Sequence, residues 1–147
     1  MGWIILTATD ELNNCDYCVT VSLVVMCEDY CSACKVLDVP PTEVIHKGER
    51  ISTLIREYEY DVWIYSEKYL LDDNIDGSII LNVLKSCKID KEKVQSLNNI
   101  GHCSVRVSIV SDYAQIPMQL LKKTLIELAS VGIDLELSVF SWGGASD

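Results

Sequence analysis

The side chains best suited to chemistry in this chain are its seven cysteines, which include two pairs with two residues between the members. Cys15 and Cys18 form one pair, and Cys31 and Cys34 form the other. Two such pairs are a common pattern for a zinc ion held by four thiolates. The segment between them, however, begins as one strand that spans roughly 30 Å and has no turn residue inside it. The pairs therefore lie at opposite ends of that strand, and we expect no metal site and no cofactor.

The pair Cys31 and Cys34 offers a different chemistry, because it follows a strand and opens a helix. At such a junction the helix N-terminus lowers the pKa of the first thiol, as in thiol oxidoreductases. Here Glu28 and Asp29 precede the pair and oppose a thiolate, and Pro40 ends the helix after about two turns. Thiol oxidoreductase activity at this pair remains an alternative, and small buried hydrophobic side chains are the favoured interpretation.

The remaining candidate site residues are the two histidines and the side chains around the glycine turn at residues 47–49. His46 and His102 show no spacing to cysteine or aspartate that indicates a catalytic arrangement. Lys47 and Glu49 flank a glycine and are followed by Trp63, so these three side chains are a possible pocket for a small ligand. Because no nucleophile, base or phosphate loop accompanies them, we expect a binding protein and not an enzyme.

The acidic residues point to the kind of partner. The chain has a net charge of −10, and residues 57–76 hold seven acids and one base, interleaved with tyrosine and tryptophan. Aromatic rings supply buried anchors in protein interfaces, while carboxylates attract and select a cationic partner. An acidic chain of this kind repels nucleic acid and anionic membranes. The residues expected to contact a basic protein partner are Glu57, Glu59, Asp61, Tyr65, Glu67, Tyr69, Asp72, Asp73 and Asp76.

Alternating apolar residues predict the strands that position these side chains. Strands are expected over residues 17–26, 102–110 and 133–140, with a hairpin over residues 50–58 and 60–66. Residues 3–8 are a candidate for an added edge strand.

Helical spacing and capping residues predict the helices. They are expected over residues 31–37, over residues 78–87 with Asp76 or Ser78 as the cap, in a turn after Asp90, and over residues 117–131. The last of these is expected to bury Leu120, Leu121, Thr124, Leu125 and Leu128 and to end at Gly132.

The order of these elements predicts an α+β fold. The first six follow the order of a ferredoxin-like split βαβ unit, with a largely antiparallel sheet, helices on one face and a C-terminal helix-strand extension. At 147 residues the chain fits a single domain over residues 1–147, with a flexible tail at residues 143–147. No apolar run approaches the length of a membrane helix, and no signal peptide is evident, so a cytoplasmic location is expected.

Four short motifs carry a resemblance to a known family. They are Leu-Asp-Val-Pro-Pro-Thr at residues 37–42, Lys-Gly-Glu at residues 47–49, Trp63 followed by Ser66, and Leu-Ala-Ser-Val-Gly-Ile-Asp-Leu at residues 128–135. In this order and spacing the chain resembles the bacterial family called domain of unknown function 4279, over about residues 17–140. The additional Pro40 and the cysteines are departures from the family pattern. The resemblance implies a small cytosolic protein of a family in which some members are associated with toxin–immunity loci, and it transfers no catalytic residue.

These observations favour a non-catalytic immunity-type protein that neutralises a basic toxin domain by covering it with residues 57–76. Two alternatives remain open. One is a small-ligand or metal-sensing domain that uses Lys47, Glu49 and Trp63 or the cysteines, and the other is the thiol oxidoreductase. The oligomeric state is not determined by the sequence.

Overall fold

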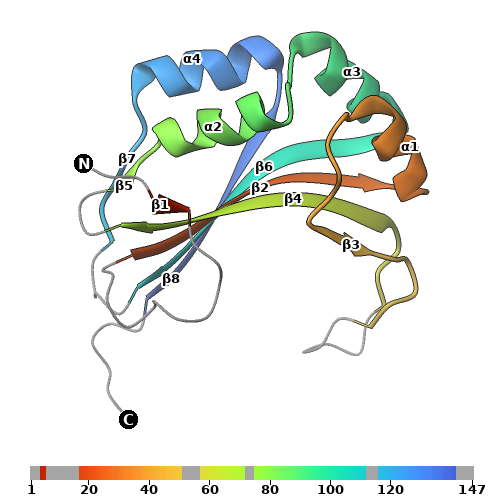
Figure 1. The fold of residues 1–147 in the computed structure, drawn as a ribbon, viewed down its shortest axis with the longest axis horizontal. Helices are drawn as coiled ribbons and strands as arrows, with labels where there is room; N and C mark the ends of the chain where they lie inside the picture. The colour runs from red at the N-terminus through yellow and green to blue at the C-terminus, as the bar shows by residue number, and fades with distance from the viewer. Residues whose placement is uncertain (1–3, 6–16, 51–56, 72–74, 112–115, 142–147) are drawn as a thin grey trace.

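The chain forms a sheet with four helices packed on one of its faces (Figure 1). The computed structural model describes residues 4–5, 17–50, 57–71, 75–111 and 116–141. Neighbouring strands of the sheet are β1 (Ile4–Ile5), β4 (Asp61–Leu71), β2 (Tyr17–Cys27), β6 (Gly101–Ser111) and β8 (Asp134–Ser141), in that order. A short strand, β3 (Glu43–Ile45), also pairs with β4.

The helices are α1 (Tyr30–Val36), α2 (Ser78–Ser86), α3 (Lys91–Ile100) and α4 (Lys122–Val131). Two further strands, β5 (Ile75–Asp76) and β7 (Met118–Gln119), form a separate parallel pair beside the start of α2. Among the described residues, no helix combines the length and hydrophobicity needed to cross a membrane.

The strand pairing confirms the predicted α+β class. Every pair in the main sheet is antiparallel except β6 with β8, which are parallel and are joined by α4. Because β4 and β6 are both antiparallel to β2, they run parallel to each other on either side of it. This is a split βαβ unit, which consists of β4, the pair α2 and α3, and β6, with β2 inserted between the strands. The C-terminal helix-strand extension is α4 and β8.

The central part of the chain differs from the predicted hairpin. The strand predicted over residues 60–66 extends to Leu71, because β4 pairs with β2 along its whole length. Of the strand predicted over residues 50–58, the structure shows an isolated bridge between Arg50 and Glu57, and residues 51–56 lie outside the described residues. Residues 72–74 and the predicted tail at residues 143–147 also lie outside the described residues.

The core lies between the sheet and the helices. Odd-numbered residues of β2, β4 and β6 point toward the helices, and Val19, Val21, Leu23, Trp63 and Val107 are fully buried there. Burial of side chains of this size contributes about 1.5–3 kcal/mol each, so this layer supplies most of the stabilising free energy.

The open face of the sheet is partly polar, as the alternation predicts. In its centre, the hydroxyls of Ser22 and Ser66 are 2.7 Å apart, and Arg106 donates to Glu136 at 3.2 Å. Val24 on the same face is nevertheless buried, since its neighbours on both adjacent strands cover it.

Aspartate side chains cap two of the helices, whereas the N-cap of α2 is Gly77, which has no side-chain cap. The Asp29 carboxylate accepts a hydrogen bond from the amide of Cys31, and the Asp90 carboxylate accepts one from Lys93, which confirms the predicted cap at Asp90. At α2 the Asp76 carboxylate accepts from the amide of Ser78, which is the first residue of the helix.

The last helix is shorter than predicted. It begins at Lys122 and not at residue 117, because Met118 and Gln119 pair with β5 in extended conformation. The predicted burial of Thr124 and Leu128 is confirmed, whereas Leu125 is 46% exposed. The prediction for Leu125 was wrong because the buried face of the helix is defined by Thr124 and Leu128, and Leu125 lies beside it.

Candidate functional site

A half-open hollow of about 310 Å³ lies at the end of the sheet where β2 ends and β6 begins. We call it the sheet-end hollow. Its lining residues are Met26, Cys27, Glu28, Tyr60, Ile100, Gly101 and His102. Three segments that are distant in sequence thus contribute to one depression: the end of β2, the residue before β4, and the junction of α3 with β6.

The hollow exists because α3 passes into β6 without a loop. Gly101 is the first residue of the strand and pairs with Cys27. An added Cβ at Gly101 would collide with the carbonyl oxygen of Met26 and would lie 2.9 Å from its carbonyl carbon. Only glycine permits this close approach of two backbones.

The rim of the sheet-end hollow combines exposed apolar groups with acidic groups. Met26 is 37% exposed and Tyr60 is 41% exposed, and both are among the large apolar side chains most open to solvent in the described structure. The Glu28 carboxylate is exposed at the same rim. On the other side, His102 Nε2 lies 3.8 Å from Asp134 Oδ2. Such a surface suits a side chain with an apolar stem and a positive end.

A buried carboxylate fixes the segments around the hollow. Asp61 is 8% exposed and follows Tyr60 directly. Its Oδ1 accepts a hydrogen bond from the amide of Lys47 at 2.9 Å, and its Oδ2 accepts one from the amide of Tyr30 at 3.0 Å. These two hydrogen bonds lower the pKa of the Asp61 carboxyl below its usual value. Asp61 therefore joins β4, α1 and the turn after β3, and holds Tyr60 in place.

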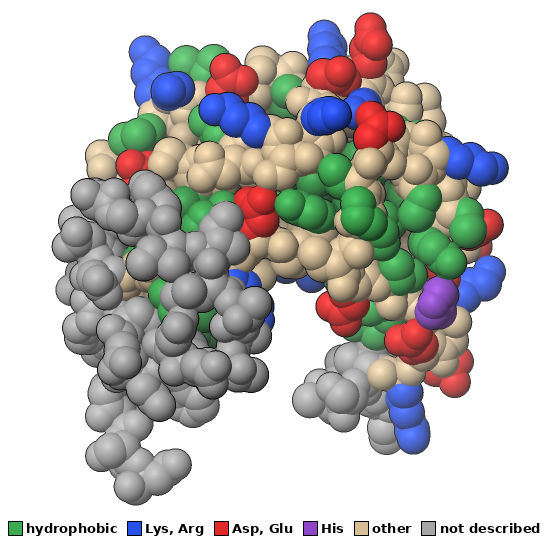
Figure 2. All heavy atoms as spheres, in the orientation of Figure 1, with side chains coloured by type: hydrophobic (Ala, Val, Ile, Leu, Met, Phe, Trp, Pro, Cys, Tyr) green, Lys and Arg blue, Asp and Glu red, His purple; other side chains and the backbone are tan. Residues whose placement is uncertain are grey.

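Further acidic side chains surround this end of the molecule. Asp29, Glu49, Glu57 and Glu59 are exposed. Figure 2 shows acidic side chains gathered at the end of the visible face where α1 and β3 lie. Lys47 Nζ is 3.5 Å from Glu28 Oε2, and both side chains are more than half exposed, so this ion pair contributes little to stability although its two charges offset each other.

Three of the predicted partner-contacting residues form a separate cluster. The Tyr65 hydroxyl donates to Glu67 Oε1 at 3.1 Å, and the Tyr69 hydroxyl donates to Glu67 Oε2 at 2.7 Å. The Ser86 hydroxyl of α2 also donates to Oε1, at 2.7 Å. These side chains lie on the helix-facing side of β4, so they contact α2 and do not share a surface with Glu57 and Glu59.

Burial governs the ionisation of this cluster. Desolvation, with the negative charge of Glu67 as a smaller cause, raises the pKa of both Tyr65 and Tyr69. The two phenols therefore remain protonated donors to the carboxylate at neutral pH. Tyr69 is 1% exposed, which makes it a component of the core and not of an open binding surface.

The remaining predicted residues are dispersed. Asp76 helps to begin α2, and Asp72 and Asp73 lie outside the described residues. Of the possible ligand pocket, Lys47 and Glu49 are exposed on a turn, whereas Trp63 is fully buried. The indole nitrogen of Trp63 has no hydrogen-bond partner among the described residues. The three side chains therefore do not line one open pocket.

The cysteines in the described part of the chain are free thiols. Cys31 and Cys34 are exposed on α1, so the interpretation of this pair as small buried side chains was wrong. Partial desolvation together with the neighbouring Asp29 raises the pKa of the Cys31 thiol. Burial raises the pKa of Cys103 to about 12. Elevated pKa values reduce the thiolate fraction, which disfavours thiol exchange at these positions. Within the described residues, no group of three or more potential ligands is placed to hold a metal ion.

Sequence reasoning did not identify Met26, Glu28, Ile100 and His102 as parts of one site. A methionine on the polar face of an otherwise buried strand was the available signal for the first of them. Ile100 and His102 carried no such signal, because only the pairing of β2 with β6 brings them to Met26.

Comparison with known proteins gives one match. The model of a domain of unknown function, DUF4279, matches residues 21–142. This agrees with the resemblance found over about residues 17–140. No curated protein and no solved structure matches the chain.

Proposed function

The chain belongs to the DUF4279 family of domains of unknown function, and from this premise we propose that it is a non-catalytic binding protein that covers a basic protein domain. The proposed role is that of an immunity protein, which neutralises a toxin by occluding its working surface. The observation that carries the proposal is the sheet-end hollow, whose lining places exposed Tyr60 and Met26 beside the Glu28 carboxylate.

The apolar part of the rim supports a protein partner. Tyrosine and methionine are enriched at protein interfaces, and a few such anchors in a pocket supply most of the binding free energy. The hollow admits the aliphatic stem of a lysine or arginine from the partner, and Glu28 then lies at the rim to accept its positive end. Occlusion of the partner requires no turnover and no cofactor.

The charge supports rapid and selective association. Glu49, Glu57 and Glu59 surround the same end of the molecule and are exposed. Clustered carboxylates attract a cationic surface over about one Debye length, which is roughly 10 Å at 0.1 M salt. Association by this surface is therefore expected to weaken as the salt concentration rises. The proposal includes a cytoplasmic location, because free thiols are typical of proteins in a reducing compartment.

The test begins with capture of the partner. Tagged protein is incubated with lysate of its native cell at low and at high salt, and the retained proteins are identified by mass spectrometry. The affinity of the purified partner is then measured by calorimetry for Tyr60→Ala, for Glu59→Lys and for the unmodified chain. Glu127→Lys makes the same charge change on α4 and serves as the matched control.

A basic partner is expected, with a dissociation constant raised about 30-fold by Tyr60→Ala and about 10-fold by Glu59→Lys. Glu127→Lys is expected to change it less than twofold. Equal affinities for all four proteins would show that the partner uses another surface. An acidic partner, or none at either salt concentration, would overturn the proposed function.

A further inference from the structure

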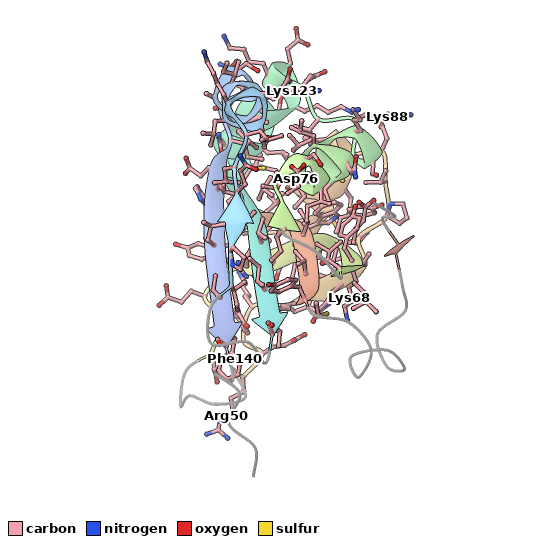
Figure 3. All side chains as sticks on the ribbon, turned by 90° about the vertical axis from the view of Figure 1, so that its left-hand side faces the viewer. Arg50, Lys68, Asp76, Lys88, Lys123 and Phe140 are labelled. Atoms are coloured by element: carbon pink, nitrogen blue, oxygen red, sulfur yellow. The ribbon has the colours of Figure 1, made fainter. Side chains whose placement is uncertain are left out.

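A second hollow, of about 330 Å³, lies between α2 and α4 on the helix layer. We call it the helix groove. Its floor is apolar and consists of Leu81, Leu84, Ile89 and Val131. Its polar lining consists of Lys85, Lys88, Lys123 and Glu127. Figure 3 labels Lys88 and Lys123, which lie at the helix side of the molecule, whereas Lys68 and Phe140 lie beside the sheet.

The charge of the groove is opposite to that of the chain. Three lysines and one glutamate line it, although the chain as a whole carries −10. Within the part of the chain that the structure describes, Lys85, Lys88 and Lys123 take part in no ion pair. A rim of three lysines and one glutamate, above an apolar floor, carries an excess of positive charge and is complementary to an anion that carries an apolar group.

Lys88 occupies a backbone conformation that normally belongs to glycine. Its φ is +52°, the only positive value at a non-glycine residue in the described structure. The amide of Ile89 donates to the Leu84 carbonyl at 2.8 Å, and that of Lys88 donates to Lys85 at 3.0 Å. This is the Schellman arrangement that ends a helix, in which the left-handed residue is usually glycine. The side chain of Lys88 thus projects from a position where glycine would be unstrained, beside the groove that it lines.

Charges at the start of α4 also contradict the usual preference. Lys122 and Lys123 occupy its first turn, where no acidic residue is present and no side chain caps the helix. The helix N-terminus carries a partial positive charge, so cations there are unfavourable and anions are favourable. An anion beside Lys123 would offset this repulsion.

Two independent departures from local preference thus meet at one groove, and each places a lysine at its rim. We propose that the helix groove binds a small amphipathic anion, with Lys85, Lys88 and Lys123 around the anionic group and Leu81, Leu84, Ile89 and Val131 against the apolar chain. This inference does not rest on the proposed function, because it concerns a different surface and the opposite charge. The volume of the groove lies at the lower end of the range for small-molecule sites.

The probe is octyl phosphate below its micelle concentration, and binding to the full chain is followed by calorimetry and by amide chemical shifts. Octyl glucoside has the same chain without the charge, and inorganic phosphate has the charge without the chain. The variants are Lys85→Gln, Lys123→Gln and Lys88→Gly. Lys91→Gln removes an exposed lysine on α3 that does not line the groove, and it is the matched control.

Octyl phosphate is expected to bind more tightly than either comparison compound and to shift amides of α2 and α4. Each glutamine variant is expected to weaken binding about threefold to fivefold, since a partly exposed charge pair contributes up to about 1 kcal/mol. Lys88→Gly is expected to weaken binding to a similar extent while the melting temperature rises, which distinguishes lost contact from lost folding. Lys91→Gln is expected to bind as the unmodified chain does.

Four outcomes would overturn the proposal. The first is an absence of octyl phosphate binding, and the second is equal binding of octyl glucoside, since either result removes the role of the anion. The third is unchanged affinity in Lys88→Gly and Lys123→Gln. Binding of a polyglutamate peptide in place of octyl phosphate would assign the groove to acidic protein segments and would equally overturn it.

Discussion

The sheet-end hollow and the helix groove are similar in volume, about 310 and 330 Å³, and opposite in charge. Glu28, with exposed Tyr60 and Met26, lines the first, whereas three lysines and Glu127 line the second. The net charge of −10 is therefore unevenly distributed, since a groove with an excess of positive charge lies on the helices. Total charge alone is therefore a poor guide to what each surface of this protein binds.

The two sites also differ in how the chain builds them. Around the sheet-end hollow, residues obey local preferences: Asp29 begins α1, Asp61 accepts two amides, and Gly101 occupies a position that admits no Cβ. At the helix groove, Lys88 and Lys123 oppose local preferences. The residues around the sheet-end hollow stabilise the fold, whereas Lys88 and Lys123 at the helix groove lower its stability. A loss of stability is the usual consequence where side chains serve binding.

Gly101→Ala is expected to have the largest effect. The added methyl group would meet backbone atoms of Met26 and Cys27, which cannot move without disturbing the pairing of β2 with β6. We expect the free energy of unfolding to fall by about 3 kcal/mol, as measured by urea denaturation. Residues of the helix groove are distant, so octyl phosphate affinity is expected to remain unchanged below the unfolding transition. A loss below 0.5 kcal/mol would contradict the described approach of the two strands.

Asp61→Asn is expected to lower the free energy of unfolding by about 2 kcal/mol at pH 7, because an amide cannot accept at both of its terminal atoms. The pKa of Asp61 is lowered in the folded chain, so its contribution is complete above the unfolded pKa of about 4 and disappears as the pH falls through the folded pKa. The difference between variant and unmodified chain should therefore shrink below pH 4. A difference that is constant from pH 7 to pH 3 would show that the carboxylate charge is irrelevant.

The ends of α2 and α4 provide a matched pair of smaller effects. Each of these two helices is followed by a residue in the left-handed conformation, which is Lys88 after α2 and Gly132 after α4. Lys88→Gly is expected to raise the free energy of unfolding by about 0.5–1 kcal/mol, and Gly132→Ala to lower it by about 1 kcal/mol. An added Cβ at Gly132 meets no atom within 4 Å, so its effect reports the backbone alone. Thermal unfolding of both variants measures the difference, and a destabilised Lys88→Gly would refute the assignment of strain.

The smallest effect is expected for Lys47→Gln at the sheet-end hollow. Its ion pair with Glu28 is exposed, so the free energy of unfolding should change by less than about 0.5 kcal/mol. The variant makes this end more negative, and its affinity for a basic partner should increase slightly at low salt and converge with that of the unmodified chain at high salt. A decrease in affinity would mean that Lys47 itself contacts the partner.

Local patterns in the sequence predicted much of the fold and little of the site. The alternation of residues 17–26 and 102–110 identified β2 and β6, and Asp90 was identified as a cap, because these signals depend on neighbouring residues. The start of α4 was misplaced, since the pairing of Met118 with Ile75 overrides the helical signal of Pro117. The predicted strand ended at residue 66, and only the pairing of β4 with β2 and its packing against α2 place Tyr65, Glu67 and Tyr69 together beneath the helices.

The sequence by itself determined the α+β class, the acidic character of the chain and its family, because composition, periodicity and ordered motifs are properties of neighbours along the chain. Tertiary structure alone decided that Met26, Tyr60 and Ile100 line one hollow, and that lysines of α2 and α4 line another. Both sites arise where segments distant in sequence pack together. Strand register and helix packing set those contacts, and no local pattern encodes them.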